Sequence, residues 1–205
     1  MEQLKMIAKE LKEVSYPELN IENFCSAPDE ERYQKFLNTV VFKNVDNPEV
    51  VKRQIVEKKI SGRTDFTGVW IKGNEGICVI PKRETLYDEM IGIHEITHLV
   101  NYMTRHIVDG SVAKEVVPYF NEYEYLSRIH EFYQKYYEKY RFYNAIKASK
   151  EYCNKGNEDA LSYLYAYLLL QKRKDSYNIK KLNNANVKKM SLSKSLKRKG
   201  YTLNL

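Results

Sequence analysis

Residues 85–103 read TLYDEMIGIHEITHLVNYM, and much of the expected architecture can be built outward from them. Thr85 followed by Asp88 is typical of a capping box, in which each side chain accepts a hydrogen bond from the backbone N–H of the other residue. Apolar residues then recur along the segment, which favours a helix that packs one face into a core. The segment therefore predicts a helix from Thr85 to about Met103.

Within this predicted helix, His94-Glu95-Ile96-Thr97-His98 matches the pattern H-E-x-x-H. Residues four apart lie on one side of a helix, about 40° apart in projection, so both imidazoles can reach one zinc ion. Glu95 lies beside the pair and could take a proton from a water molecule whose pKa zinc lowers toward 7. The pattern predicts one Zn²⁺ per chain, held by His94 and His98, with Glu95 as the catalytic base.

A catalytic zinc ion needs a third protein ligand. The longer pattern H-E-x-x-H-x-x-G-x-x-H would place its glycine at Asn101 and its histidine at Thr104, so it does not apply. A glutamate on the next helix is the better candidate, and Glu115, Glu122 and Glu124 are available. Glu115 and Glu122 are seven residues apart and share one helix face. If the chain turns and runs back, Glu115 comes to lie beside His98.

The segment Glu115-Val-Val-Pro-Tyr-Phe-Asn-Glu122 resembles the second zinc-site segment of the thimet oligopeptidase and oligoendopeptidase family. In that family the first glutamate is the third zinc ligand and the later one supports the site. The resemblance covers roughly residues 68–170 and implies that Glu115 binds zinc while Glu122 orients a ligand. Glu115 follows His98 at a shorter spacing than is usual in the family, and at this spacing Glu122 could itself be the ligand.

Ser162-Tyr-Leu-Tyr-Ala-Tyr167 resembles the tyrosine-rich stretch of the same family, whose hydroxyls stabilise the tetrahedral oxyanion. By position, Tyr165 is the best match and Tyr163 the next, and the resemblance implies a catalytic role for them. A stripe of Tyr and Leu at helical spacing is also typical of a helix buried in a core. Both interpretations of Tyr165 remain open at this point.

The segments 68–72 and 76–80 are apolar and β-branched, and Gly73-Asn74-Glu75 separates them, which predicts a β-hairpin that ends before Pro81. Helical spacing is found on both sides of the hairpin, in segments 1–14, 30–42, 48–60, 119–143 and 159–172. The sequence thus predicts a mostly helical α+β fold, zincin-like, with a small sheet beside the active-site helix. Residues 1–175 are expected to form one domain and 176–205 a basic tail.

Charge is distributed unevenly, because residues 1–170 carry a net charge of −3 and residues 171–205 carry +10. The basic tail could bind nucleic acid, an acidic protein or a membrane surface, but it is poor in aromatic residues for base stacking. A solvated tail is the preferred interpretation. One alternative to a peptidase is therefore a nucleic-acid-binding accessory protein acting through this tail, and another is a zinc-binding protein without proteolytic activity.

Three cysteines, Cys25, Cys78 and Cys153, are widely spaced, which argues against a disulfide framework and against a thiolate zinc site. No apolar run approaches the length of a membrane span. The acidic, helical N-terminus argues against a signal peptide. The sequence therefore predicts a cytoplasmic enzyme that acts on a peptide or protein and has no membrane partner, and its oligomeric state is left open.

Overall fold

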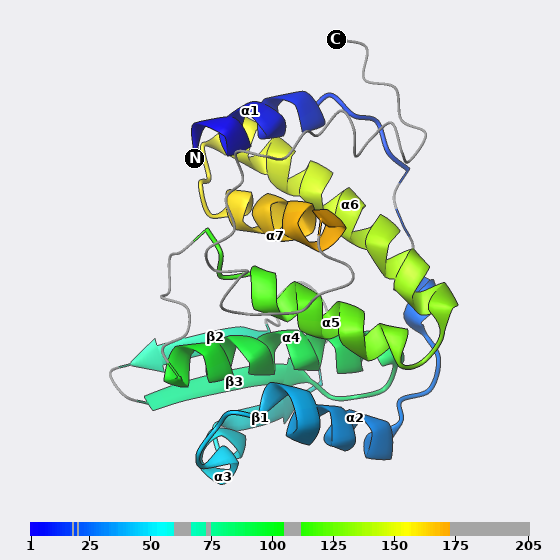
Figure 1. Cartoon of the computed structure of the whole chain (residues 1–205), viewed down its shortest axis with the longest axis vertical. Helices are drawn as coiled ribbons and strands as arrows, with labels where there is room; N and C mark the ends of the chain where they lie inside the picture. The colour runs from blue at the N-terminus through cyan, green and yellow to red at the C-terminus, as the bar shows by residue number, and fades with distance from the viewer. Residues whose placement is uncertain (18, 20, 60–66, 73–74, 105–111, 173–205) are drawn as a thin grey trace. The chain divides into compact units, whose positions relative to one another are not determined.

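The computed structural model describes residues 1–17, 19, 21–59, 67–72, 75–104 and 112–172. It is a mostly helical α+β structure with one three-stranded sheet, which confirms the coarse fold prediction (Figure 1). The elements in chain order are α1 Glu2–Leu11, the 3₁₀-helix η1 Ile21–Phe24, α2 Glu30–Phe36, the π-helical turn η2 Leu37–Val41, α3 Pro48–Lys52, β1 Ile55–Lys58, β2 Gly68–Lys72, β3 Glu75–Pro81, α4 Leu86–Met103, α5 Val116–Ser127, α6 Glu131–Lys155 and α7 Ala160–Lys172.

The sheet has the strand order β1-β3-β2. β2 and β3 pair antiparallel with Trp70 opposite Ile77, as expected for the predicted hairpin. β1 pairs parallel to β3 on its other side, with Ile55 opposite Cys78. The hairpin prediction is therefore confirmed, and the third strand adds a parallel pair that the sequence did not reveal.

The helix predicted to run from Pro48 to about Ile60 is shorter than expected. α3 ends at Lys52, and the chain enters β1 at Ile55. The backbone N–H of Cys78 donates to the carbonyl oxygen of Gln54 over 2.8 Å, so pairing with β3 already begins just before the strand. The β-branched residues at the start of β1 fit this pleated pairing better than a helix.

The predicted helix over 119–143 is two helices. α5 ends at Ser127, and α6 begins at Glu131 and continues to Lys155. His130 lies at the break, where its ring Nδ1 accepts a hydrogen bond of 3.1 Å from the backbone N–H of Phe132. A side-chain acceptor of this kind satisfies a free N–H at a helix start and so stabilises a new helix.

The chain groups into two compact units. The first contains residues 1–19, 110–116 and 138–205, and the second contains residues 20–109 and 117–137. In the first unit α1 packs against α7 (Figure 1), and Lys5 on α1 forms an ion pair of 2.7 Å with Glu158 just before α7. The predicted domain boundary at residue 175 stays a prediction, because the tail at 176–205 lies outside the described residues.

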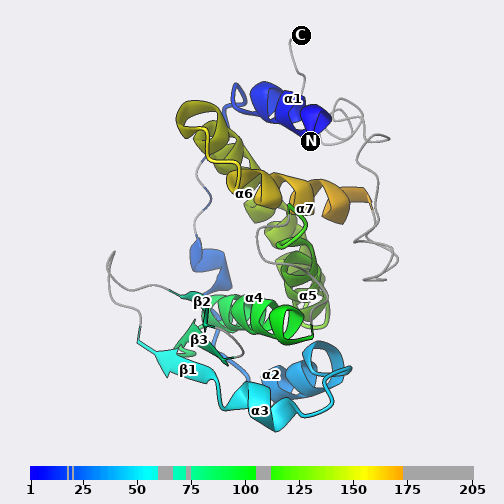
Figure 2. The ribbon, with the colours of Figure 1, turned by 90° about the vertical axis from the view of Figure 1, so that its left-hand side faces the viewer.

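In the second unit α4 lies along the three-stranded sheet (Figure 2). Met90, Ile93 and Leu99 of α4 are buried, as are Cys78 and Ile80 of β3. This apolar layer holds α4 against the sheet, since burying each such side chain contributes roughly 1.5–3 kcal/mol. The segment that carries the H-E-x-x-H pattern is therefore part of the core of its unit.

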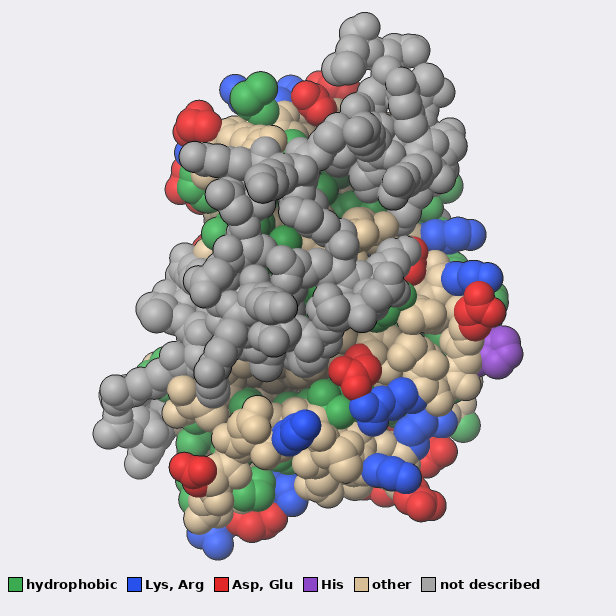
Figure 3. All heavy atoms as spheres, viewed as in Figure 1, with side chains coloured by type: hydrophobic (Ala, Val, Ile, Leu, Met, Phe, Trp, Pro, Cys, Tyr) green, Lys and Arg blue, Asp and Glu red, His purple; other side chains and the backbone are tan. Residues whose placement is uncertain are grey.

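Among the described residues, no helix combines the length and the hydrophobicity that crossing a lipid bilayer requires. On the face of the molecule in Figure 3, acidic and basic side chains lie interspersed. Among the described ion pairs, Arg83 contacts Glu30 and, over 3.0 Å, Glu57. Exposed ion pairs of this kind contribute little to stability.

Candidate metal centre

The first turn of α4 has the predicted capping box. The backbone N–H of Asp88 donates to Oγ1 of Thr85 over 3.3 Å, and the backbone N–H of Thr85 donates to Oδ2 of Asp88 over 2.8 Å. The box satisfies N–H groups that the first turn leaves without helical partners. It also fixes the start of the helix, and His94 and His98 follow two and three turns later on one side.

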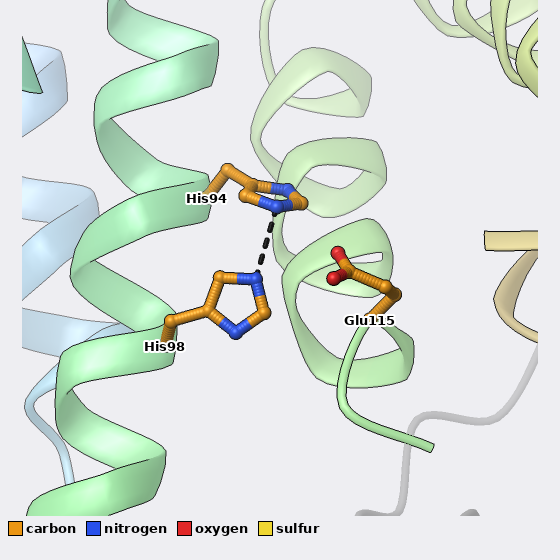
Figure 4. A group of neighbouring side chains, drawn as sticks. All are labelled: His94, His98 and Glu115. Carbon is orange, nitrogen blue, oxygen red and sulfur yellow. Dashed lines mark hydrogen bonds between the residues drawn. The ribbon is translucent and has the colours of Figure 1, made fainter. Parts of the chain in front are cut away.

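The imidazoles of His94 and His98 face one another. Their Nε2 atoms are 3.1 Å apart, and the rings meet edge to face (Figure 4). Two nitrogens bound to one tetrahedral zinc ion at about 2.0–2.1 Å would be about 3.3 Å apart. The pair therefore already has nearly the separation that two ligands of one metal ion require.

Glu115 brings a carboxylate to this pair. Its side chain is directed toward the two imidazoles in Figure 4, and one ligand atom from each of His94, His98 and Glu115 lies within 4.8 Å of the others. Glu115 is assigned to the first compact unit, but it directly precedes Val116, the first residue of α5. Its carboxylate is buried. Two imidazoles and one carboxylate form a donor set that can hold a metal ion.

Glu122 contacts the opposite edge of the His94 ring. Its Oε1 lies 2.9 Å from Nδ1 of His94, and Glu122 is fully buried on α5. A carboxylate only accepts hydrogen bonds, so Nδ1 must be the donor. A neutral His94 then has its lone pair on Nε2, the nitrogen that faces His98. This matches the usual support of a metal-binding histidine by a carboxylate behind it.

Glu95 lies on a neighbouring side of α4 and is half-buried. The hydroxyl of Thr67, the residue before β2, donates to Oε1 of Glu95 over 3.5 Å. The thiol of Cys78 on β3 lies near Glu95. Burial, and then the charge of Glu95, raise the pKa of this thiol. Glu95 therefore lies between α4 and the start of the hairpin.

The two tyrosines predicted to stabilise an oxyanion lie on α7. Tyr165 is buried, and burial raises the pKa of its hydroxyl, whereas Tyr163 is exposed. Both belong to the first compact unit. The surroundings of Tyr165 agree with the core interpretation of this stripe, and its catalytic role stays a prediction.

Two further buried polar pairs join α4 to α5, and sequence patterns did not indicate them. Tyr125 donates to Oε2 of Glu89 over 2.5 Å. Asn121 donates from its side-chain amide to Oγ1 of Thr97 over 2.9 Å. As the residue number rises along α4, that of its partner falls along α5, so the helices run antiparallel. The pairs join the same two helices as the contact between His94 and Glu122.

The signal that could have indicated these pairs is a polar side chain inside an otherwise apolar helix face. Glu89 and Asn121 are such residues, and buried groups of this kind almost always find a partner. Which partner each residue finds depends on the packing of two helices, which no local pattern reveals.

Comparisons of this chain with models of protein families, with curated proteins and with solved structures found no match.

Proposed function

We propose that this chain is a zinc-dependent peptidase of the zincin type. The main support is the arrangement around His94: its Nε2 faces His98, its Nδ1 is held by the buried Glu122, and the Glu115 carboxylate lies within reach. In this proposal His94, His98 and Glu115 hold one Zn²⁺, and Glu122 orients His94. The structure provides a donor set that can hold a metal ion. The proposal that this ion is zinc rests on that donor set and on the H-E-x-x-H pattern.

Zinc bound by these side chains would lower the pKa of a water molecule and polarise a substrate carbonyl. Glu95 would take a proton from that water as its oxygen bonds to the carbonyl carbon, and would give the proton to the leaving amine nitrogen as the C–N bond breaks. Thr67 supports this role, because its hydrogen bond to Oε1 leaves Oε2 of Glu95 available as the proton acceptor.

The free edge of β2 offers a place for the substrate. Among the described residues β2 pairs with β3 alone, so its other edge has unpaired backbone groups that can bind an extended peptide as an added strand. Thr67 directly precedes this edge and contacts Glu95. A peptide along β2 would therefore extend past the proposed catalytic base. A cytoplasmic location is part of the same proposal.

The first test is the metal content of the purified full-length chain, measured by elemental analysis. We expect about one zinc ion per chain and its loss in His94→Ala. His130→Ala is the matched control, since His130 is exposed and caps α6, and this variant should keep its zinc. A wild-type protein that holds no zinc after incubation with the metal and gentle dialysis would refute the proposal.

The second test separates a peptidase from a metal-binding protein without proteolytic activity. Glu95→Gln should keep its zinc but lose cleavage of a peptide library, followed by mass spectrometry. The control is Glu84→Gln, an exposed residue just before α4, which should cleave as the wild type does. If the zinc-loaded wild type cleaves no peptide in the library, the non-proteolytic alternative is favoured.

A further inference from the structure

Tyr137 is a fully buried residue of α6 whose hydroxyl reaches the back of the metal centre. The hydroxyl donates to Oε2 of Glu122, and the carbonyl oxygen of Tyr119 lies 3.1 Å from it. Glu122 in turn contacts Nδ1 of His94 through its other oxygen, Oε1. A continuous chain of hydrogen bonds therefore connects α6, α5 and α4 and ends at the His94 ring.

The order of donors in this chain follows from the chemistry of its members. A carboxylate accepts at both oxygens, so the Tyr137 hydroxyl donates to one and the Nδ1–H of His94 donates to the other. The two donors come from different helices and approach opposite ends of the carboxylate. Together they hold Glu122 in one orientation, and Glu122 holds the proton of His94 on Nδ1 and leaves Nε2 as a ligand.

A second buried pair shows what a purely structural contact of this type looks like. Tyr125 donates to Glu89, which also accepts from the backbone N–H of Asp29 over 2.7 Å and lies 3.4 Å from Arg32. Both pairs join a tyrosine to a buried carboxylate on or beside α4. They differ in one respect: Glu122 contacts a histidine of the metal centre, whereas the contacts described for Glu89 are to α2 and α5.

We propose that Tyr137 is a positioning residue for the metal centre, acting on His94 through Glu122. The inference rests on the proposed metal site and adds a residue outside it. Loss of the hydroxyl should leave Glu122 with one donor fewer, so that the carboxylate no longer has one preferred orientation behind His94. Changes behind a metal-binding histidine typically weaken metal binding 10–100-fold.

The first experiment measures zinc affinity of the full-length chain by competition with a chromophoric chelator. Tyr137→Phe should bind zinc at least about tenfold more weakly than the wild type. Tyr125→Phe is the matched control, because it loses the same kind of buried hydrogen bond, and its affinity should stay within about twofold. Equal affinity of Tyr137→Phe and the wild type, or equal weakening of both variants, would overturn the proposal.

The second experiment needs no metal, so it separates failure of this inference from failure of the proposed function. Histidine side-chain ¹⁵N–¹H correlation spectra of the metal-free protein report which ring nitrogen carries the proton. We expect His94 protonated at Nδ1 in the wild type and in Tyr125→Phe, and a mixture of tautomers in Tyr137→Phe. Unchanged tautomers in Tyr137→Phe would overturn the proposal. If Tyr137→Phe does not fold, the spectrum of the wild type alone tests the proposal. A wild-type His94 that carries its proton on Nε2 would then overturn the proposal.

Discussion

Asn121 on α5 donates a hydrogen bond of 2.9 Å to Oγ1 of Thr97, inside the H-E-x-x-H segment of α4. Both side chains are buried, and the Thr97 hydroxyl donates onward to the carbonyl oxygen of Ile93 over 2.7 Å. Thr97 therefore joins the two helices that carry His94 and Glu122.

Thr97→Val keeps the shape of the side chain but removes the acceptor for Asn121. We expect the free energy of unfolding to fall by about 1–3 kcal/mol, because a buried amide loses a hydrogen-bond partner. Urea denaturation monitored by circular dichroism measures the change. Thr39→Val is the control, since its hydroxyl makes the same bond to a carbonyl four residues back but is exposed, and its effect should stay within about 0.5 kcal/mol. Equal effects of the two changes would contradict the role given to Thr97.

Gly92 allows the ring of Tyr33 to approach α4 two residues before His94. A Cβ at Gly92 would lie 2.5 Å from the Tyr33 hydroxyl oxygen but 3.5 Å from Cζ of the same ring. Gly92→Ala should therefore lower the free energy of unfolding by about 1–3 kcal/mol, because a buried ring must shift. Thermal or urea denaturation measures this loss.

The same substitution in a Tyr33→Phe background gives a sharper expectation. The Tyr33 hydroxyl oxygen, which is the atom closest to a Cβ at position 92, is then absent. The other neighbouring atoms lie at ordinary van der Waals distances from that Cβ. Alanine is favoured over glycine inside a helix by up to about 1 kcal/mol, so Gly92→Ala should become neutral or stabilising. Tyr33→Phe alone should cost little, because the buried hydroxyl has no hydrogen-bond partner among the described residues. A loss of the same size in both backgrounds would show that the hydroxyl is not what excludes a side chain.

Glu122→Ala tests the contact behind His94 directly. Removing the carboxylate frees Nδ1 and lets the ring turn, so zinc affinity should fall about 10–100-fold. Chelator competition measures the change. Glu124→Ala on the same helix is the control, because Glu124 makes a surface ion pair with Arg128, and its affinity should match the wild type. If Glu122→Ala instead bound no zinc at all while Glu115→Ala bound it normally, the two glutamates would have exchanged roles.

The parts of the fold that local signals determine could be predicted from the sequence. Helix α4 could be predicted because the signals for it, a capping box and apolar helical spacing, lie within its own segment of the sequence. β1 was missed because its residues become a strand through pairing with β3, more than one element later in the chain. The break between α5 and α6 was missed because tyrosines continue through the predicted helix, whereas His130 acts as a cap only through its contact with Phe132.

The candidate site divides in the same way. His94, Glu95 and His98 form a pattern within a single helix, and Glu115 was reached through the family resemblance. The partners that hold the site depend on the antiparallel packing of α4 and α5, so no local pattern assigns Asn121 to Thr97 or Tyr125 to Glu89. Tyr137 is one of eight tyrosines between residues 119 and 143, and only its contact with Glu122 distinguishes it.

Of the three cysteines in the chain, Cys78 is buried and Cys25 is exposed. Burial, and then the charge of Glu95, raise the pKa of Cys78 above its ordinary value of 9.0. Its contribution to stability is therefore fully present below about pH 9 and is lost as the pH rises further, because the unfolded thiol ionises first. We expect an aromatic disulfide reagent at pH 8 to modify Cys25 rapidly in a Cys78→Ala variant. A variant whose sole cysteine is Cys78 should react only as fast as it unfolds, and fast reaction in the folded protein would contradict the buried position of this thiol beside β1 and α4.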